Sequence, residues 1–227
     1  GGPGNDTLNG GAGSDLLFGG LHNDTYVFST ATVTEADQVT ENTNEGIDTI
    51  SFAALTTNVA LHLGSNVVQN VHTNRTLKLN SPNTFENSIG GSGADSLAGN
   101  GASNTLTGGP GNDTLNGGAG SDLLFGGLHN DTYVFSTATA AEADQVTENT
   151  NEGIDTISFS TLTTNVVLNL GLVGIQTVHT NRTVQLNSLS TFENAVGGSG
   201  SDTLIGNALA IKPDQNVVTI ASRQFVA

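Results

Sequence analysis

Residues 108–134 read GGPGNDTLN, GGAGSDLLF and GGLHNDTYV, three consecutive segments of one nine-residue pattern. The pattern is Gly-Gly-x-Gly-x-Asp-x-(apolar)-x. Its strict form occurs six times, beginning at Gly1, Gly10, Gly90, Gly108, Gly117 and Gly197. Two more copies begin at Gly19 and Gly126 and have His at the fourth position. Self-similarity at a fixed short period is typical of solenoids, in which each repeat stacks on the next.

Each position of this nonapeptide has a physical role. Glycines at positions one, two and four let the backbone adopt positive φ and approach a bound ion closely. Such a turn directs carbonyl oxygens inward, and Asp at position six adds a carboxylate. Both are hard oxygen ligands that suit Ca²⁺. Positions seven to nine form a short strand, whose alternation sends only position eight into a core. The core residues expected at position eight are Leu8, Leu17, Tyr26, Leu97, Leu106, Leu115, Leu124, Tyr133 and Leu204.

Stacking of the repeats would place carboxylates above one another. Two nonapeptides complete one coil, so that turns n and n+2 lie on the same side, about 4.8 Å apart. Two bare charges at that distance repel by about 1 kcal/mol in water, and by roughly 3 to 4 kcal/mol at an effective dielectric constant of about 20. A cation between the turns is therefore expected. A flexible Gly-rich linker, the alternative, would not keep an apolar residue at every eighth position.

The composition narrows the class of protein. The 227-residue chain carries 21 Asp and Glu against 5 Lys and Arg, a formal net charge of −16. Nucleic acids and anionic membranes attract basic surfaces, so neither is an expected partner. Cys is absent, which excludes disulfides and thiolate metal sites. No apolar run approaches the length of a membrane span. The absence of Met, even at position 1, predicts a mature fragment or part of a longer protein.

The chain repeats itself with a period of 107 residues, because residues 1–32 are identical to residues 108–139. We predict a first unit at 1–107 and a second at 108–210. In the first unit, nonapeptides at 1–27 and 90–107 flank a segment at 28–89 that we expect to be β-structured. Residues 211–227 depart from the pattern and are predicted to form a C-terminal cap or to begin another domain.

The segment between the nonapeptides reads as a degenerate continuation of the same coil. Thr43–Ser51 keeps Gly, Asp and an apolar residue at positions four, six and eight, and Thr32–Thr40 keeps the last two. Alternating apolar residues at 59–63 and 77–79 indicate strands. The stretch VHTNRT, at 71–76 and 178–183, contains His and Arg side chains that we expect to make solvated loop contacts.

The nonapeptides resemble the RTX, or haemolysin-type, calcium-binding repeats of secreted bacterial proteins. The resemblance implies an all-β fold, a parallel β-roll of stacked turns with longer degenerate coils between them, and several bound Ca²⁺ ions. In that family one turn gives the carbonyls of positions two and four and its Asp. The turn two nonapeptides later gives the carbonyls of positions one and three and its own Asp. The first implied site joins Gly2, Gly4 and Asp6 with Gly19, Leu21 and Asp24. The second joins Gly91, Gly93 and Asp95 with Gly108, Pro110 and Asp113, and the third joins Gly109, Gly111 and Asp113 with Gly126, Leu128 and Asp131.

If the degenerate turns stay in phase, the resemblance implies four further Asp pairs: Asp15 with Asp37, Asp24 with Asp48, Asp122 with Asp144, and Asp131 with Asp155. Asn104 stands in place of Asp, so a site shared with Asp122 would have one negative charge fewer and is expected to be weak or empty. Asp202 has no downstream partner. His22 and His129, at position four, are expected to lend a backbone carbonyl only.

The function implied is that of a calcium-binding, calcium-folded structural or spacer module in a large repetitive protein, secreted or at the cell surface through bacterial type I secretion. Its expected partners are calcium, neighbouring units and copies of itself, assembled end to end into fibres. The alternative is an accessory module of a secreted enzyme whose catalytic domain lies elsewhere. We expect no catalytic activity in this chain, which has no nucleophile–base–orienter set and no HExxH motif. Recognition of ice or glycans ranks last, because the residues at positions three and five are irregular.

Overall fold

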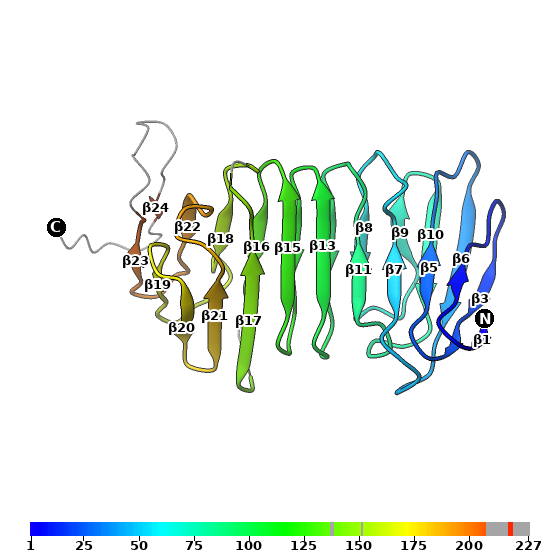
Figure 1. Cartoon of the computed structure of the whole chain (residues 1–227), viewed down its shortest axis with the longest axis horizontal. Coiled ribbons are helices and arrows are strands. Elements are labelled where there is room, and N and C mark those ends of the chain that lie inside the picture. Colours follow the sequence, from blue (N-terminus) through cyan, green and yellow to red (C-terminus); the bar gives the residue numbers. More distant parts are fainter. Residues whose placement is uncertain (137–138, 151, 208–217, 220–227) are drawn as a thin grey trace.

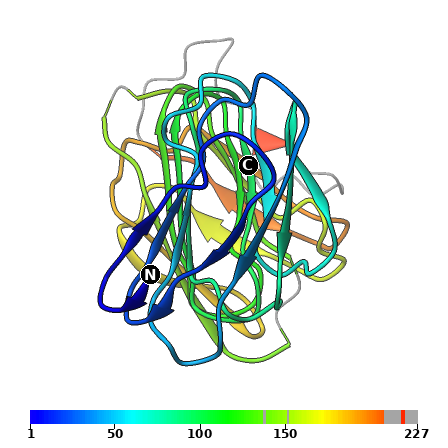
Figure 2. The same cartoon turned by 90° about the vertical axis from the view of Figure 1, so that its right-hand side faces the viewer.

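The computed structural model describes residues 1–136, 139–150, 152–207 and 218–219. These residues form strands and turns and no helix, and so no helix among them has the length and apolar character needed to cross a bilayer. The strands stack side by side in one elongated solenoid (Figure 1). Viewed along the stack, the chain winds as a flattened coil (Figure 2). The predicted all-β, parallel β-roll is confirmed.

The strands form one long sheet on one face of the coil and shorter sheets on the other. The long sheet has nine strands, in the order β2 (Thr7–Leu8), β5 (Thr25–Val27), β7 (Thr49–Ser51), β11 (Asn87–Ile89), β13 (Thr105–Pro110), β15 (Leu123–Leu128), β17 (Glu142–Thr147), β21 (Arg182–Leu186) and β20 (Gly174–His179). A seven-stranded sheet contains β24 (Val218–Thr219), β22 (Asn194–Val196), β18 (Thr156–Ser158), β16 (Thr132–Val134), β14 (Thr114–Asn116), β12 (Ser96–Ala98) and β8 (Ala60–His62). A four-stranded sheet contains β3 (Leu16–Phe18), β6 (Glu35–Thr40), β10 (Arg75–Leu79) and β9 (Gln69–His72). Two pairs complete the set: β1 (Gly2–Pro3) with β4 (Gly20–Leu21), and β19 (Val167–Asn169) with β23 (Thr203–Ile205).

Successive strands alternate between the two faces, as a coil with two strands per turn requires. From β11 to β18, the odd-numbered strands lie in the nine-stranded sheet and the even-numbered strands in the seven-stranded sheet. Parallel neighbours in the regular repeats are offset by two nonapeptides, since Thr105 lies opposite Leu123 and Leu97 lies opposite Leu115. The predicted stacking of turns n and n+2 is confirmed.

The core lies between the two faces and is filled by position eight of the nonapeptides. Leu97, Leu106, Leu115, Leu124, Tyr26 and Tyr133 are all buried. Leu8, Leu17 and Leu204, nearer the ends of the stack, are half-buried and pack against the same core. Full burial of one such Leu contributes about 1.5 to 3 kcal/mol. The register that buries position eight also brings the turns, and their Asp residues, to the edges of the coil.

The longer segments continue the coil, as predicted, with wider offsets between partners. Tyr26 lies opposite Ile50, and Leu17 lies opposite Val39. The alternating residues at 59–63 and 77–79 lie on or directly beside β8 and β10. Their apolar members are buried: Val59, Leu61, Leu63, Leu77 and Leu79. The coil widens here because three strands, β8, β9 and β10, lie between the sheet neighbours β7 and β11, where the regular coil has one.

The VHTNRT stretches depart from the expected loops. Each forms the turn of an antiparallel hairpin, β9–β10 in the first unit and β20–β21 in the second. The expectation of solvated side chains is wrong for Arg75 and Arg182, which are 4 % and 3 % exposed. The physical reason is that each guanidinium is paired with two buried carboxylates, so that its burial is electrostatically compensated.

Equivalent strands of the two units lie on opposite faces. β5 belongs to the nine-stranded sheet, whereas its duplicate β16 belongs to the seven-stranded sheet. The same exchange relates β7 to β18 and β11 to β22. A unit of 107 residues therefore spans an odd number of half-coils.

The C-terminal stretch is only partly described. Of residues 211–227, whose predicted role is a cap or the start of another domain, the described part is β24 (Val218–Thr219). This short strand pairs in parallel with β22. The remainder lies outside the described residues, and the role of the stretch stays a prediction.

Candidate metal sites

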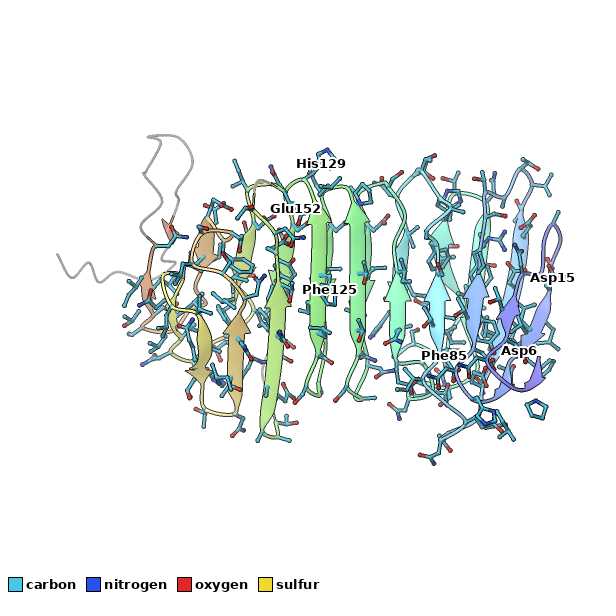
Figure 3. The ribbon with its side chains drawn as sticks, viewed as in Figure 1. Asp6, Asp15, Phe85, Phe125, His129 and Glu152 are labelled. Carbon is cyan, nitrogen blue, oxygen red and sulfur yellow. The ribbon has the colours of Figure 1, made fainter. Side chains whose placement is uncertain are left out.

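Most of the position-six residues form two rows of turns at opposite edges of the flattened coil, whereas Asp15 and Asp37 lead into the four-stranded sheet and Asp202 into β23. The first row leads into the nine-stranded sheet and contains Asp6, Asp24, Asp48, Glu86, Asn104, Asp122 and Asp144. The second row leads into the seven-stranded sheet and contains Asp95, Asp113, Asp131, Asp155 and Glu193. Figure 3 shows both edges, with Asp6 and Phe85 along one and His129 and Glu152 along the other.

Within a row, each turn is hydrogen-bonded to the next through its position-six residue. The backbone N–H of Asp6 donates to Oδ1 of Asp24 at 2.7 Å. The same 2.7 Å bond links Asp95 to Asp113 and Asp113 to Asp131. The four pairs of wider spacing are joined in the same way: Asp15 to Asp37 (3.0 Å), Asp24 to Asp48 (2.8 Å), Asp122 to Asp144 (3.0 Å) and Asp131 to Asp155 (2.8 Å). The structure thus brings every predicted Asp pair together, whatever the length of the connecting segment.

These carboxylates are buried and only partly hydrogen-bonded. Asp24, Asp113 and Asp131 are each 1 % exposed. Their second oxygen, Oδ2, has no hydrogen-bond partner, and the same holds for Oδ2 of Asp15, Asp122 and Asp202. A buried polar atom without a partner costs free energy. These oxygens are consequently suited to accept a cation.

The pKa values of the stacked carboxyl groups are raised, because burial disfavours their charged form. Burial raises the pKa of Asp131 to about 8, and the charges of Asp113 and Asp155 add to the rise. Burial also raises the pKa of Asp113 to about 6 and that of Asp155 to about 7. In the first row, burial raises the pKa of both Asp48 and Asp122 to about 7. A divalent cation reverses this balance, because it favours the charged form of every carboxylate that it contacts.

Backbone carbonyls approach the turns closely where glycine occupies positions two and four. The carbonyl oxygen of Gly91 points toward Gly109 on the next turn, where a Cβ would stand 2.5 Å away. That of Gly93 points in the same way toward Gly111. Gly109 and Gly111 have φ of +107° and +147°, which glycine adopts without strain. The glycines therefore keep open a space bordered by carbonyl oxygens.

The carbonyls of positions one and three hold adjacent turns together. Those of Gly19 and Leu21 accept the N–H groups of Gly2 and Gly4, at 2.7 and 3.1 Å. In the second row, the carbonyl of Leu128 accepts the N–H of Gly111 at 2.9 Å. The carbonyl oxygens of Gly108 and Gly126 lie against the position-one glycine of the turn before, and Pro110 lies opposite Leu128 in the ladder of β13 and β15. Most of the predicted carbonyl ligands thus lie between adjacent turns of the rows, and their part in metal binding stays a prediction.

His at position four adopts the backbone conformation of the glycine that it replaces. His22 and His129 have φ of +80° and +81°, in the left-handed region. Their carbonyl oxygens face Gly46 and Gly153, the position-four glycines of the next turns. Backbone geometry at position four is therefore retained although the residue has changed.

At two of the predicted pairs a guanidinium already supplies positive charge. Arg182 is ion-paired with Glu142 and Asp144, and it also donates to the carbonyl of Gly118 at 3.3 Å. Gly118 is position two of the nonapeptide that contains Asp122, and this turn stacks on that of Asp144. Arg182 therefore contacts a carbonyl and a carboxylate oxygen that the family pattern would give to calcium. Arg75 is paired in the same way with Asp37 and Glu35, the latter at 2.6 Å. At these two stacks the chain itself thus supplies a positive charge.

Asn104 replaces a carboxylate with a neutral amide, which the chain itself satisfies. Its amide nitrogen donates to the carbonyl of Glu86 at 3.0 Å, and its Oδ1 accepts the N–H of Asn100 at 2.7 Å. Both ends of the amide are therefore occupied by the chain itself. Asp202, in contrast, accepts the N–H of Val166 at 2.9 Å with one oxygen and has no partner for the other.

Sequence reasoning missed several acidic residues that join the rows. Glu86 and Glu193 occupy the position-six place after Asp48 and Asp155, from which they accept a backbone N–H. Glu41 joins Asp24 and Asp48 in one cluster, and its duplicate Glu148 joins Asp131 and Asp155. The signal that would have found Glu41 and Glu148 is the stretch ENTNEG, which is identical in the two units. It places two glutamates, four residues apart, at the start of a degenerate turn.

Comparison with known proteins adds one finding. The family model of the RTX calcium-binding nonapeptide repeat matches the chain in four copies, at residues 1–29, 89–124, 107–135 and 192–208. The matches cover the regular nonapeptides and leave out most of the segments between them. No curated protein matches the chain.

Proposed function

Because the chain is an RTX-type calcium-binding repeat protein, we propose that it serves as a calcium-folded structural module, without catalytic activity, of a larger protein that is secreted or displayed at the cell surface. One observation carries the proposal: the position-six carboxylates are buried in stacks, and Asp24, Asp113 and Asp131 each have an oxygen without a partner. A module of this kind would fold only where calcium is plentiful.

The donors at these stacks fit calcium. Carboxylate and carbonyl oxygens are its preferred ligands, and the chain has no Cys that would favour a softer metal. Bound calcium would supply the positive charge that lets the stacked carboxylates ionise together. The residues proposed to hold it lie in the pairs Asp6–Asp24, Asp95–Asp113, Asp113–Asp131, Asp24–Asp48 and Asp131–Asp155, with the carbonyls that border them. At Asp15–Asp37 and Asp122–Asp144 we propose that the arginines replace the ion.

Calcium at these sites would contribute a large share of the stability. Extracellular modules bind calcium with dissociation constants of about 10⁻⁴ to 10⁻³ M. At millimolar calcium, each site at the tight end adds about 1.4 kcal/mol by mass action. Several such sites together approach the roughly 5 to 15 kcal/mol that stabilises a typical domain. Inside a calcium-poor cell the chain would stay unfolded, which suits export through a narrow type I channel.

The ends of the stack support assembly into longer rods. β2 is the outermost strand of the nine-stranded sheet, and nothing among the described residues pairs with its outer edge. β3 is likewise the outermost strand of the four-stranded sheet, and its Leu16 and Phe18 are 55 % and 53 % exposed. Their duplicates Leu123 and Phe125 lie on β15, which has a strand on each side, and are half-buried. A further unit or a second copy of the chain would cover this end, and end-to-end stacking would produce a fibre.

The test is a calcium titration of the chelator-treated chain, followed by far-UV circular dichroism, with magnesium as the control ion. We expect a cooperative transition from coil to β-structure in the millimolar range with calcium and none with magnesium, which requires a smaller octahedral site. A chelated chain that is already fully β-structured and indifferent to calcium would overturn the proposal.

A further inference from the structure

Each unit contains a buried acid cluster in which one member, a glutamate, lies outside the nonapeptide pattern. In the first unit it consists of Asp24, Glu41 and Asp48, and in the second of Asp131, Glu148 and Asp155. All six side chains are 1 to 2 % exposed, and within each cluster one oxygen of every carboxylate lies within 4.8 Å of the others. Oxygens bound to one calcium at about 2.3 to 2.6 Å can be up to about 5 Å apart, so the spacing fits this ion.

Glu41 occupies a place that belongs to a backbone carbonyl in the regular turns. There, the N–H of Gly2 donates to the position-one carbonyl of Gly19 at 2.7 Å. One coil further on, the N–H of Gly20 is instead 3.4 Å from Oε2 of Glu41. The next bond of the pattern is retained, since the N–H of His22 donates to a backbone carbonyl as that of Gly4 does. The wider turn thus replaces a neutral carbonyl with a carboxylate.

Each cluster contains at least one buried carboxylate oxygen without a hydrogen-bond partner. Oδ2 of Asp24, Oδ2 of Asp131 and Oε2 of Glu148 are buried without a hydrogen bond. The missing Cβ of Gly126 leaves a space bordered by oxygens of Asp131, Glu148 and Tyr133. Gly19 leaves the equivalent space in the first unit. These unpartnered atoms indicate a ligand independently of the acidity of the cluster.

The chain also fixes the backbone of the added glutamate. The N–H of Glu41 donates to Oδ1 of Asn80 at 3.0 Å, and Nδ2 of Asn80 donates back to the carbonyl of Glu41 at 2.6 Å. Asn187 makes the same two bonds to Glu148, at 3.0 and 2.7 Å. The glutamate is therefore positioned before any ion binds.

We propose that each unit holds one calcium site of a distinct kind, in which Glu41 or Glu148 adds a third carboxylate to the stacked Asp pair. This inference rests on the proposed function, since it requires that the chain binds calcium. Three carboxylates attract a divalent cation more strongly than two, because calcium affinity follows the charge of the ligand set. These two sites fill first as calcium rises, and the regular sites fill after them.

The chain carries its own reporters for these two sites. It has two Tyr and no Trp. The hydroxyl of Tyr26 donates to Glu41, and that of Tyr133 donates to Glu148. Terbium replaces calcium in oxygen sites and emits when a nearby excited tyrosine transfers its energy. Tyrosine-sensitised emission consequently reports on the acid clusters and on the sites that share Asp24 or Asp131 with them, and the glutamate variants separate the two contributions.

The test is a terbium titration of the full chain with tyrosine excitation, followed by competition with calcium. We expect Glu41→Gln with Glu148→Gln to raise the terbium concentration at half-maximal emission by about tenfold, since each site loses one of three charges. The matched control is Glu45→Gln with Glu152→Gln. These acids lie in the same turns, but their carboxylates accept the N–H groups of Asn42 and Asn149. The control is expected to shift the midpoint less than twofold.

Two further measurements keep the outcomes separate. Tyr26→Phe and Tyr133→Phe assign the emission to each unit, and the single variant Glu41→Gln leaves the second site intact should the double variant fail to fold. Equal midpoints for the Gln variants at 41 and 148 and for the control would overturn this inference, while the calcium-driven dichroism change would leave the proposed function standing. Absence of that dichroism change in the unaltered chain would instead remove the proposed function.

Discussion

At the scale of the residue, buried carboxylates in this chain meet three kinds of neighbour. Asp37 has the guanidinium of Arg75. Asn104, which replaces a carboxylate, donates from its own amide to a backbone carbonyl. Oδ2 of Asp131 has no hydrogen-bond partner. In the first arrangement the chain supplies a positive charge, and in the second it removes a negative one, so we expect metal ions chiefly at stacks of the third kind.

The internal cation can be removed by substitution. Arg75→Met leaves Glu35 and Asp37 buried without a counter-charge, and we expect it to lower the free energy of unfolding by about 3 to 5 kcal/mol. Lys78→Met, on the same strand but exposed, is expected to change it by less than about 0.5 kcal/mol. Urea denaturation at saturating calcium measures both. Equal midpoints would show that the guanidinium does not compensate the two acids.

The positive φ at position two gives a second residue-scale prediction. Gly109→Ala combines a φ of +107° with a Cβ that would stand 2.5 Å from the carbonyl of Gly91. We expect a loss of about 1 to 3 kcal/mol from backbone strain alone. Gly101→Ala is the control, since its Cβ would meet nothing closer than 3.7 Å and φ there is not positive. Thermal melts in calcium should separate the two, and similar melting temperatures would argue against a close approach of the turns.

At the scale of the element, the regular strands could be predicted because one rule sets them locally. A position-eight residue such as Leu115 is buried wherever the nonapeptide occurs, and its partner in the ladder follows from counting two repeats. Contacts between residues at positions that are not equivalent in the nonapeptide could not be predicted in this way. The β9–β10 hairpin and the burial of Arg75 depend on a strand added between turns, and Glu41 reaches its cluster only through a turn wider than nine residues.

The same rule predicts which deletions the stack tolerates. Removing residues 108–116 takes out one whole nonapeptide, which moves every later turn to the opposite edge of the coil but keeps the nine-residue phase. Because the turns at both edges follow the same pattern, we expect calcium-driven folding to persist with fewer ions bound. Removing residues 108–112 leaves a turn without its glycines and shifts the strand after it out of register. Circular dichroism during calcium titration should show a cooperative transition for the first deletion and a weakened or absent one for the second. If both behave alike, register along the stack is not set by the nonapeptide.

At the scale of the whole molecule, residues that lie in one row of turns in the first unit have their duplicates in the other row in the second unit. The acid cluster of Asp24, Glu41 and Asp48 belongs to the row of the nine-stranded sheet, and that of Asp131, Glu148 and Asp155 belongs to the row of the seven-stranded sheet. Calcium that binds first at these clusters would therefore anchor both edges of the coil. One edge could not close while the other remained open, which favours a cooperative transition.

The exchange of faces between units also sets the symmetry of any longer array. Two units related in this way are connected by a half-turn about the long axis and a shift along it, which is an approximate twofold screw. The β9–β10 hairpin and its duplicate β20–β21 lie in sheets on opposite faces. A rod made of many such units would present the same hairpin alternately on its two sides, and a neighbouring rod or a ligand would meet identical surfaces from either direction.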